Sequence, residues 1–163
     1  MNKILLRGRM IDAVSDTPVE DAAVLIEGDR IAYAGPYENC PEKELPAYSF
    51  PGGTILPGFI DVHAHLTGDE DAGSFANGQL FGDQLIGAVY QVGLLLDAGF
   101  TGIRDMSEAG FYLSRGVERG AIRGPRIVPG GKVLGITSGH VDMSPQMTKE
   151  YINAHAHLSM LCD

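Results

Sequence analysis

The segment LPGFIDVHAHL, residues 56–66, places two histidines two positions apart at the end of an apolar run. Side chains alternate between the two faces of a β-strand, so the segment predicts one polar and one apolar face. The predicted polar face carries Phe59, Asp61, His63 and His65. The predicted apolar face carries Ile60, Val62, Ala64 and Leu66. We expect the apolar face to pack against other elements and both imidazoles to project from the opposite face.

The sequence after this strand alternates between helical and strand-like patterns. Residues 79–99 predict a helix, because Leu85, Val89, Val92 and Leu96 recur at helical spacing and Gly99 is suited to its end. Short strands are expected at 100–106 and 125–130, with a second helix at 108–120 between them. This order predicts a parallel sheet built from βα units. Residues 145–163 are ambiguous and could form a frayed helix.

The sequence before residue 54 has the character of short strands joined by turns. Residues 22–36 predict a hairpin through Gly28-Asp29, and one further strand is possible at 47–50 before Gly52-Gly53 closes the section. The sequence therefore predicts a small antiparallel β unit, which we assign to residues 1–57. The βα units occupy residues 58–163.

Composition narrows the possible partners and locations. The 163 residues are 44% hydrophobic and 20% charged, with a formal net charge of −9. No basic stripe follows the chain, so we expect no nucleic-acid partner and no binding to an anionic membrane. The longest apolar run near the start, Ile4 to Leu6, is too short for a secretory signal. Cys40 and Cys162 are the only cysteines, which favours reduced thiols in a cytoplasmic protein.

The spacing of His63 and His65 suits a metal site. On one face of a strand their Cα atoms lie about 7 Å apart, and both rings can converge on one divalent cation. Such a cation lowers the pKa of a coordinated water to about 7 and polarises a scissile carbonyl, which is the chemistry of hydrolysis. Imidazole suits several divalent ions, and zinc is the one we expect first.

Several segments together resemble a known family. GTILPGFIDVHAHL (53–66) resembles the first barrel strand of the amidohydrolase superfamily of metal-dependent hydrolases. IEGDRIAYAGP (26–36) is similar to the hairpin of their small β-sandwich domain. AGFTGIRDM (98–106) and GPRIVPGGKVLGITSGHVD (124–142) look like the next barrel strands in the imidazolonepropionase and Xaa-Pro dipeptidase (prolidase)-like branch.

The resemblance implies a fold and an activity. It implies a β-sandwich portion followed by a partial (β/α) TIM-type barrel containing the first three or so βα units. It assigns His63 and His65 as metal ligands in hydrolysis of a non-ester C–N bond in a small amide, cyclic amide or dipeptide. The family pattern also includes a carbamylated lysine, further histidines and an aspartate general base on later strands. Lys132 and Lys149 do not end apolar strands, so neither matches that lysine.

A complete barrel takes about 250 residues, so the resemblance covers only its front part. We expect the general base to lie outside this chain and the chain alone to be a poor hydrolase. A non-catalytic metal-binding fragment and a degenerate product without independent function remain open. Unpaired strand edges and an uncovered apolar face also favour self-association or aggregation.

Other polar residues are weaker candidates. His140 and Asp142, in SGHVD, could line a substrate pocket or form a solvated loop. Asp105 could point to the pocket mouth or cap the following helix. Asp61 could orient a neighbouring ligand through a hydrogen bond or be a buried polar residue of the barrel floor.

The tail repeats part of the opening motif. NAHAHLSMLCD, residues 153–163, contains the same His-Ala-His-Leu string as residues 63–66. His155 and His157 could add two ligands to a four-histidine site. Alternatively, the tail is incidental, left by an internal deletion or a frame error in the gene.

Overall fold

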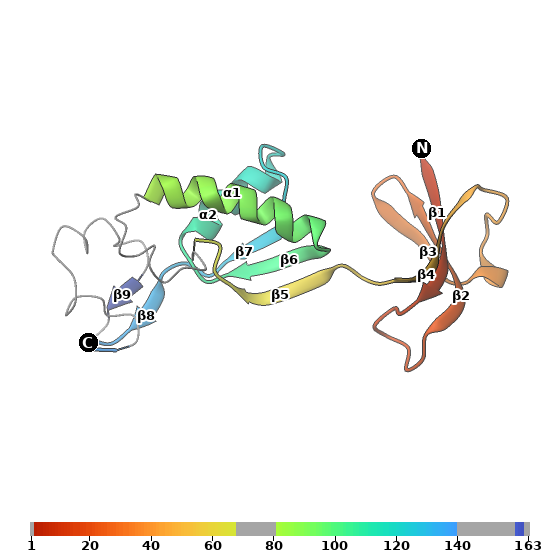
Figure 1. Cartoon of the computed structure of the whole chain (residues 1–163), viewed down its shortest axis with the longest axis horizontal. Helices are drawn as coiled ribbons and strands as arrows, with labels where there is room; N and C mark the ends of the chain where they lie inside the picture. The colour runs from red at the N-terminus through yellow and green to blue at the C-terminus, as the bar shows by residue number, and fades with distance from the viewer. Residues whose placement is uncertain (1, 68–80, 140–158, 162–163) are drawn as a thin grey trace. The chain divides into compact units, whose positions relative to one another are not determined.

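The computed structural model describes residues 2–67, 81–139 and 159–161 (Figure 1). The chain forms two compact units, Met1–Pro57 and Gly58–Asp163. The segment 53–66, which resembles one barrel strand, is divided between two strands. β4 ends at Ile55 and β5 begins at Phe59, with Leu56, Pro57 and Gly58 between them.

The first unit is a four-stranded sheet with the order β3-β2-β1-β4. Its strands are β1 (Lys3–Met10), β2 (Val19–Glu27), β3 (Arg30–Pro36) and β4 (Ala47–Ile55). The first three pair antiparallel, whereas β4 runs parallel to β1. The expectation of a purely antiparallel unit is therefore wrong for β4. The reason is the connection through the 3-10 turn η1 (Tyr37–Asn39), which returns the chain so that β4 starts alongside the middle of β1.

Glycines explain both the confirmed hairpin and the unexpected length of β4. The hairpin is confirmed: Glu27 pairs with Arg30, and Gly28 has the positive φ of 62° that such a tight turn requires. β4 does not end at Gly52-Gly53. The strand bulges there, so that Ser49 pairs with Arg7 but Thr54 pairs with Arg9. Gly52, with φ 76°, takes a left-handed conformation inside this bulge.

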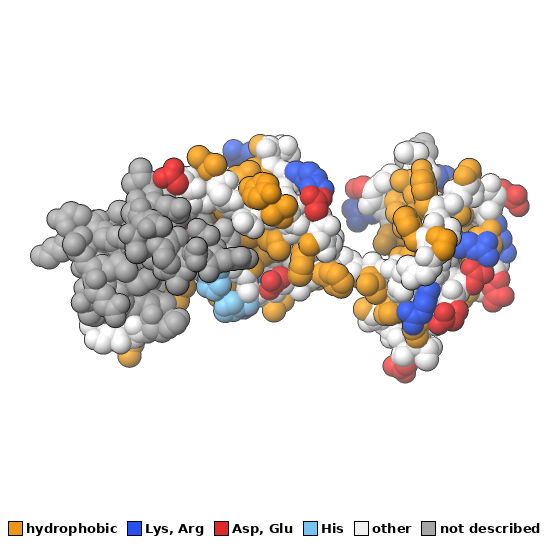
Figure 2. Space-filling model, viewed as in Figure 1, with side chains coloured by type: hydrophobic (Ala, Val, Ile, Leu, Met, Phe, Trp, Pro, Cys, Tyr) orange, Lys and Arg blue, Asp and Glu red, His pale blue; other side chains and the backbone are white. Residues whose placement is uncertain are grey.

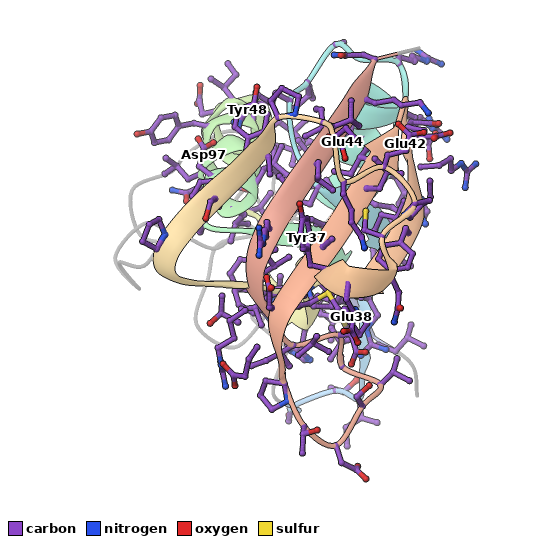
Figure 3. All side chains as sticks on the ribbon, turned by 90° about the vertical axis from the view of Figure 1, so that its right-hand side faces the viewer. Tyr37, Glu38, Glu42, Glu44, Tyr48 and Asp97 are labelled. Carbon is purple, nitrogen blue, oxygen red and sulfur yellow. The ribbon has the colours of Figure 1, made fainter. Side chains whose placement is uncertain are left out.

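Apolar side chains line both faces of this sheet. One face buries Leu5, Ala23 and Leu25 together with the free thiol of Cys40. The segment after β3 covers this face, and Figure 3 shows Tyr37 of that segment lying over the sheet. The Arg7 guanidinium stacks 3.7 Å from the centre of the Tyr37 ring. The opposite face carries a second cluster built on Met10, Ala22 and Val24.

The second unit follows the predicted order of strands and helices. It contains β5 (Phe59–Ala64), α1 (Phe81–Asp97), β6 (Phe100–Asp105), α2 (Ala109–Glu118) and β7 (Arg126–Pro129). The three strands form a parallel sheet with the order β5-β6-β7, and both helices lie on one face of it (Figure 1). The alternation of parallel strands and helices is thus confirmed. The barrel itself stays a prediction.

The core of this unit lies between the sheet and the two helices. Its buried residues include Ile103 and Ile127 from the strands and Val92 and Leu113 from the helices. The inner face of α1 differs by one position from the predicted stripe, since Ala88 is buried whereas Val89 is 40% exposed. The predicted end of α1 is confirmed: Gly99, with φ 94°, donates its N–H to the Leu96 carbonyl at 3.0 Å.

Two short strands form a separate parallel pair, β8 (Val133–Gly135) and β9 (Ser159–Leu161). The frayed helix considered for 145–163 is wrong at Ser159–Leu161, and the preceding part of that segment lies outside the described residues. Within the described ranges, no helix is long and apolar enough to cross a membrane. The cytoplasmic location stays a prediction.

Candidate metal site on strand β5

The histidine pair lies at the end of strand β5, which has an irregularity in its pairing with β6. Asp61 pairs with Ile103 and Ala64 pairs with Asp105, so three steps along β5 match two along β6. This extra residue is a β-bulge, and it breaks the simple alternation expected for residues 59–66. Ala64 and Leu66 pack into the core as predicted, but Ile60 and Val62 are 71% and 63% exposed.

The two imidazoles lie together despite the bulge. The Nε2 atoms of His63 and His65 are 3.3 Å apart, and the ring centres are 5.2 Å apart with a tilt of 57°. Both side chains are exposed, and Figure 2 shows them as a patch on the side of the sheet away from the helices. The prediction that both rings project from the same face of the strand is confirmed.

The spacing of the two nitrogens suits a shared cation. A tetrahedral zinc ion with Zn–N bonds of about 2.0–2.1 Å holds neighbouring nitrogens about 3.3–3.4 Å apart. The observed separation of 3.3 Å matches that value. Two imidazoles at this distance can also share one hydrogen bond if only one ring carries its proton on Nε2. The separation of the two nitrogens is therefore compatible with a shared metal as well as with a hydrogen bond between the rings.

The described part of the chain supplies no third ligand. It contains no group of three or more His, Cys, Asp or Glu side chains arranged to hold a metal ion. The further candidates His140, Asp142, His155 and His157 lie outside the described residues. Lys132, which does not match the family lysine, has its Nζ 3.8 Å from Glu108.

Asp61 acts on the backbone of the first histidine. Its Oδ1 atom accepts a hydrogen bond of 2.9 Å from the His63 backbone N–H. Because Asp61 is the pairing partner of the buried Ile103, its Cβ projects to the helix-covered side of the sheet. The carboxylate thus spans the bulge and holds the main chain of His63.

Asp105 is fully buried at the end of β6. Its Oδ1 atom accepts a hydrogen bond of 2.9 Å from the Leu66 backbone N–H, and its Oδ2 atom accepts one of 2.6 Å from the Ser107 hydroxyl. The expected alternative, a cap for the following helix, is wrong. The residue before α2 is Glu108, and its side chain makes no capping hydrogen bond.

Two glycines next to Asp105 were not singled out from the sequence. A Cβ atom on Gly110 would lie 2.8 Å from Oδ2 of Asp105, and one on Gly130 would lie 2.7 Å from its carbonyl oxygen. Gly130 also donates its N–H to that carbonyl at 2.6 Å. The only sequence signal was their place, with Gly110 in the first turn of α2 and Gly130 directly after β7, which does not reveal a close approach.

Comparison with known proteins relates this arrangement to a group of hydrolases. No family model matches the chain. Ochratoxinase from Aspergillus niger is 29% identical over an alignment of 136 positions, which covers 77% of this chain and 27% of the ochratoxinase. Imidazolonepropionase from Bdellovibrio bacteriovorus is 37% identical over 65 residues, covering 37% of this chain and 15% of that protein.

Solved structures share the fold over nearly the whole chain. A prolidase complexed with N-methylphosphonate-L-proline superposes with a TM-score of 0.79 at 30% identity, covering 99% of this chain and 41% of that one. An amidohydrolase superposes with a TM-score of 0.78 at 26% identity over the same shares. The chain is a homologue of the amidohydrolases.

This amidohydrolase homologue matches only part of its relatives. It spans about a quarter of the length of the curated ochratoxinase and about two fifths of the solved prolidase. The crystal structure of A. niger ochratoxinase also superposes, with a TM-score of 0.78 at 22% identity, and supports the fold.

Proposed function

We propose that this amidohydrolase homologue carries the first two ligands of a divalent-metal site used to hydrolyse non-ester C–N bonds. Residues 1–57 would form part of the small β domain and residues 58–163 the front of a β/α barrel. The substrate would be a small amide, cyclic amide or dipeptide, and the metal would be zinc before other divalent ions. The observation that carries the proposal is the 3.3 Å separation of the Nε2 atoms of His63 and His65.

Each residue of the site has a separate task in this proposal. His63 and His65 would hold the cation through Nε2, with Asp61 fixing the His63 main chain. A bound divalent cation would supply Lewis acidity and a coordinated water of lowered pKa. The general base and the remaining ligands would come from outside the described residues.

The chain alone should bind a metal better than it turns over a substrate. A catalytic zinc site normally has three protein ligands and an open position, whereas the described residues bring only two histidines together. We therefore propose poor hydrolysis by this chain. Binding without turnover is the second candidate function, and the lack of a third donor among the described residues favours it.

Metal analysis and activity assays test these proposals. We expect the purified chain to bind one Zn²⁺, and we expect His63→Ala and His65→Ala to weaken binding at least tenfold in competition with a chromophoric chelator. Val62→Ala, an exposed change in the same strand, is the matched control. Equal binding by the wild type and both histidine variants would refute the assigned ligands.

Two further variants separate the candidate functions. Loss of tightly held zinc in His155→Ala or His157→Ala would assign the tail histidines to a four-histidine binding site. Turnover of an Xaa-Pro dipeptide or cyclic amide above the level of His63→Ala would show that the chain is catalytically competent by itself. Lack of zinc binding together with strong binding of an apolar dye would favour a degenerate product.

We also propose that the isolated chain self-associates through the open side of the β5-β6-β7 sheet. β5 and β7 are its edge strands, and Ile60 and Val128 are 71% and 54% exposed. Unpaired edges and exposed apolar side chains favour association. Light scattering should show smaller particles for Ile60→Lys than for Ile31→Lys, a matched exposed position in the first unit. Equal particle sizes would exclude this face.

A further inference from the structure

We infer that Asp105 is a positioning residue that presets the two imidazoles at metal-binding distance by holding the main chain behind His65. The inference rests on the proposed metal site and names a residue that controls it without touching the metal. It is carried by the hydrogen bond from the Leu66 N–H to the buried Asp105 carboxylate.

His65 lies just outside the regular strand. β5 ends at Ala64, whose carbonyl accepts a hydrogen bond of 2.8 Å from the N–H of Met106, the residue directly after β6. Beyond that point the sheet does not fix the backbone of His65. The Asp105 carboxylate fixes the next position instead, because it accepts a hydrogen bond of 2.9 Å from the Leu66 N–H. Because the Leu66 N–H belongs to the peptide that begins at the His65 carbonyl carbon, this bond restricts rotation after His65.

A second carboxylate holds the other end of the pair. Asp61 accepts from the His63 N–H at 2.9 Å, on the bulge before Ala64. Asp61 therefore holds the N–H of His63 at the start of the pair. Asp105 holds the N–H of Leu66, the residue directly after His65. The two Nε2 atoms lie 3.3 Å apart on a main chain that is held at both ends.

The Asp105 carboxylate is itself held in place. Its other oxygen accepts from Ser107, and Gly110 in the first turn of α2 leaves room for it. A carboxylate with no exposed surface costs much free energy unless hydrogen bonds compensate. These contacts make the carboxylate a fixed point that links β6 and α2 to the histidine pair.

The experiment compares Asp105→Ala, Asp105→Asn and Leu113→Ala in the full chain. Leu113→Ala is the control, because Leu113 is 1% exposed in the same core but has no hydrogen bond to the β5 end. The first readout needs no metal: the NMR contact between the His63 and His65 rings and the hydrogen-exchange protection of the Leu66 amide. The second is the affinity for Co²⁺, followed by its visible absorption.

We expect Asp105→Ala to abolish the ring-to-ring contact and the Leu66 protection, and to weaken Co²⁺ binding about 10- to 100-fold. Asp105→Asn keeps an oxygen for Leu66, and the Ser107 hydroxyl can turn to accept from the new amide. Asp105→Asn should therefore keep the ring contact and bind Co²⁺ with an affinity within about threefold of the wild type. This result would differ from that of Asp105→Ala because one oxygen atom is enough to position the Leu66 N–H. Leu113→Ala should keep both properties under conditions where it is folded.

An unchanged ring contact in Asp105→Ala would overturn the inference, as would an equal loss in Leu113→Ala or Asp105→Asn. If Asp105→Ala does not fold, Gly110→Ala replaces it. That change pushes on the carboxylate without removing it, and unchanged ring contact and Leu66 protection there would refute positioning. The ring contact of the metal-free chain could depend on Asp105 while Co²⁺ does not bind measurably. That result would support the positioning role and refute the proposed function.

Discussion

His63 and His65 place their Nε2 atoms 3.3 Å apart at the end of strand β5. Both side chains are exposed, so a cation can reach the pair from solvent. The main chain around the pair contains a β-bulge, and two aspartates accept hydrogen bonds from its N–H groups. Local changes around the pair should therefore affect metal binding and stability in separable ways.

Metal binding should stabilise the chain. A ligand that binds only the folded state at 100 times its Kd adds about 2.7 kcal/mol to the free energy of unfolding. Zn²⁺ should therefore raise the midpoint of thermal unfolding of the second unit, and a chelator should reverse the rise. The double variant His63→Ala/His65→Ala should show no rise, while Val62→Ala should respond as the wild type does. A rise of equal size in the double variant would place the metal elsewhere.

Two glycine-to-alanine changes in the helices should have opposite effects on stability. Gly87 lies on the exposed face of α1 with open space around its Cα, so alanine should add about 0.5–1 kcal/mol through helix propensity. A Cβ atom on Gly110 would lie 2.8 Å from Asp105 and 3.1 Å from Pro129, so alanine should cost about 1–3 kcal/mol. Urea unfolding curves measure both changes. Stabilisation by Gly110→Ala would show that the crowding is relieved without cost.

Two isoleucines in the second unit offer a matched test of the core. Ile103 in β6 is 2% exposed, whereas Ile86 in α1 is 73% exposed. Ile103→Ala should lower the free energy of unfolding by about 2–5 kcal/mol because it leaves a cavity under the helices. Ile86→Ala should change it by less than about 0.5 kcal/mol. Similar losses at both positions would mean that the outer face of α1 is also buried in solution.

The ion pair between Asp97 and Arg123 should make a pH-dependent contribution to stability. The hydrogen bond from Arg123, aided by its charge, lowers the pKa of the Asp97 carboxyl below its ordinary value. A carboxyl with a lowered folded-state pKa stabilises the fold above its ordinary pKa of about 3.9. That contribution is lost as the pH falls through the folded-state pKa.

NMR titration of the Asp97 carboxyl carbon measures this effect directly. Arg123→Ala should raise the pKa of Asp97 toward its ordinary value. Arg119→Ala, which removes another exposed arginine of the same unit, should leave the pKa of Asp97 in place. A pKa of Asp97 that stays low in Arg123→Ala would assign the shift to another neighbour.

The periodicity of the sequence was enough to predict the strand and helix order of the second unit. A repeat of apolar residues every three or four positions marks α1, and Gly99 marks its end, because both signals depend on neighbours within one helix. The spacing of His63 and His65 likewise predicted that their rings would meet. The two helix signals are local, so the sequence alone determines them, whereas the bond between Leu66 and Asp105 behind the histidine pair is not local.

Tertiary pairing decided the remaining features. The bulge in β5, the parallel pairing of β4 with β1, and the hydrogen bond from Leu66 to Asp105 all join residues far apart in the chain. A period-two pattern places Asp61 beside His63, whereas the register against β6 turns its Cβ to the covered side. Register is set by which strand lies alongside and by where a buried carboxylate finds its donors. No single segment contains that information, because the free energy that favours one register comes from contacts between segments in the packed sheet.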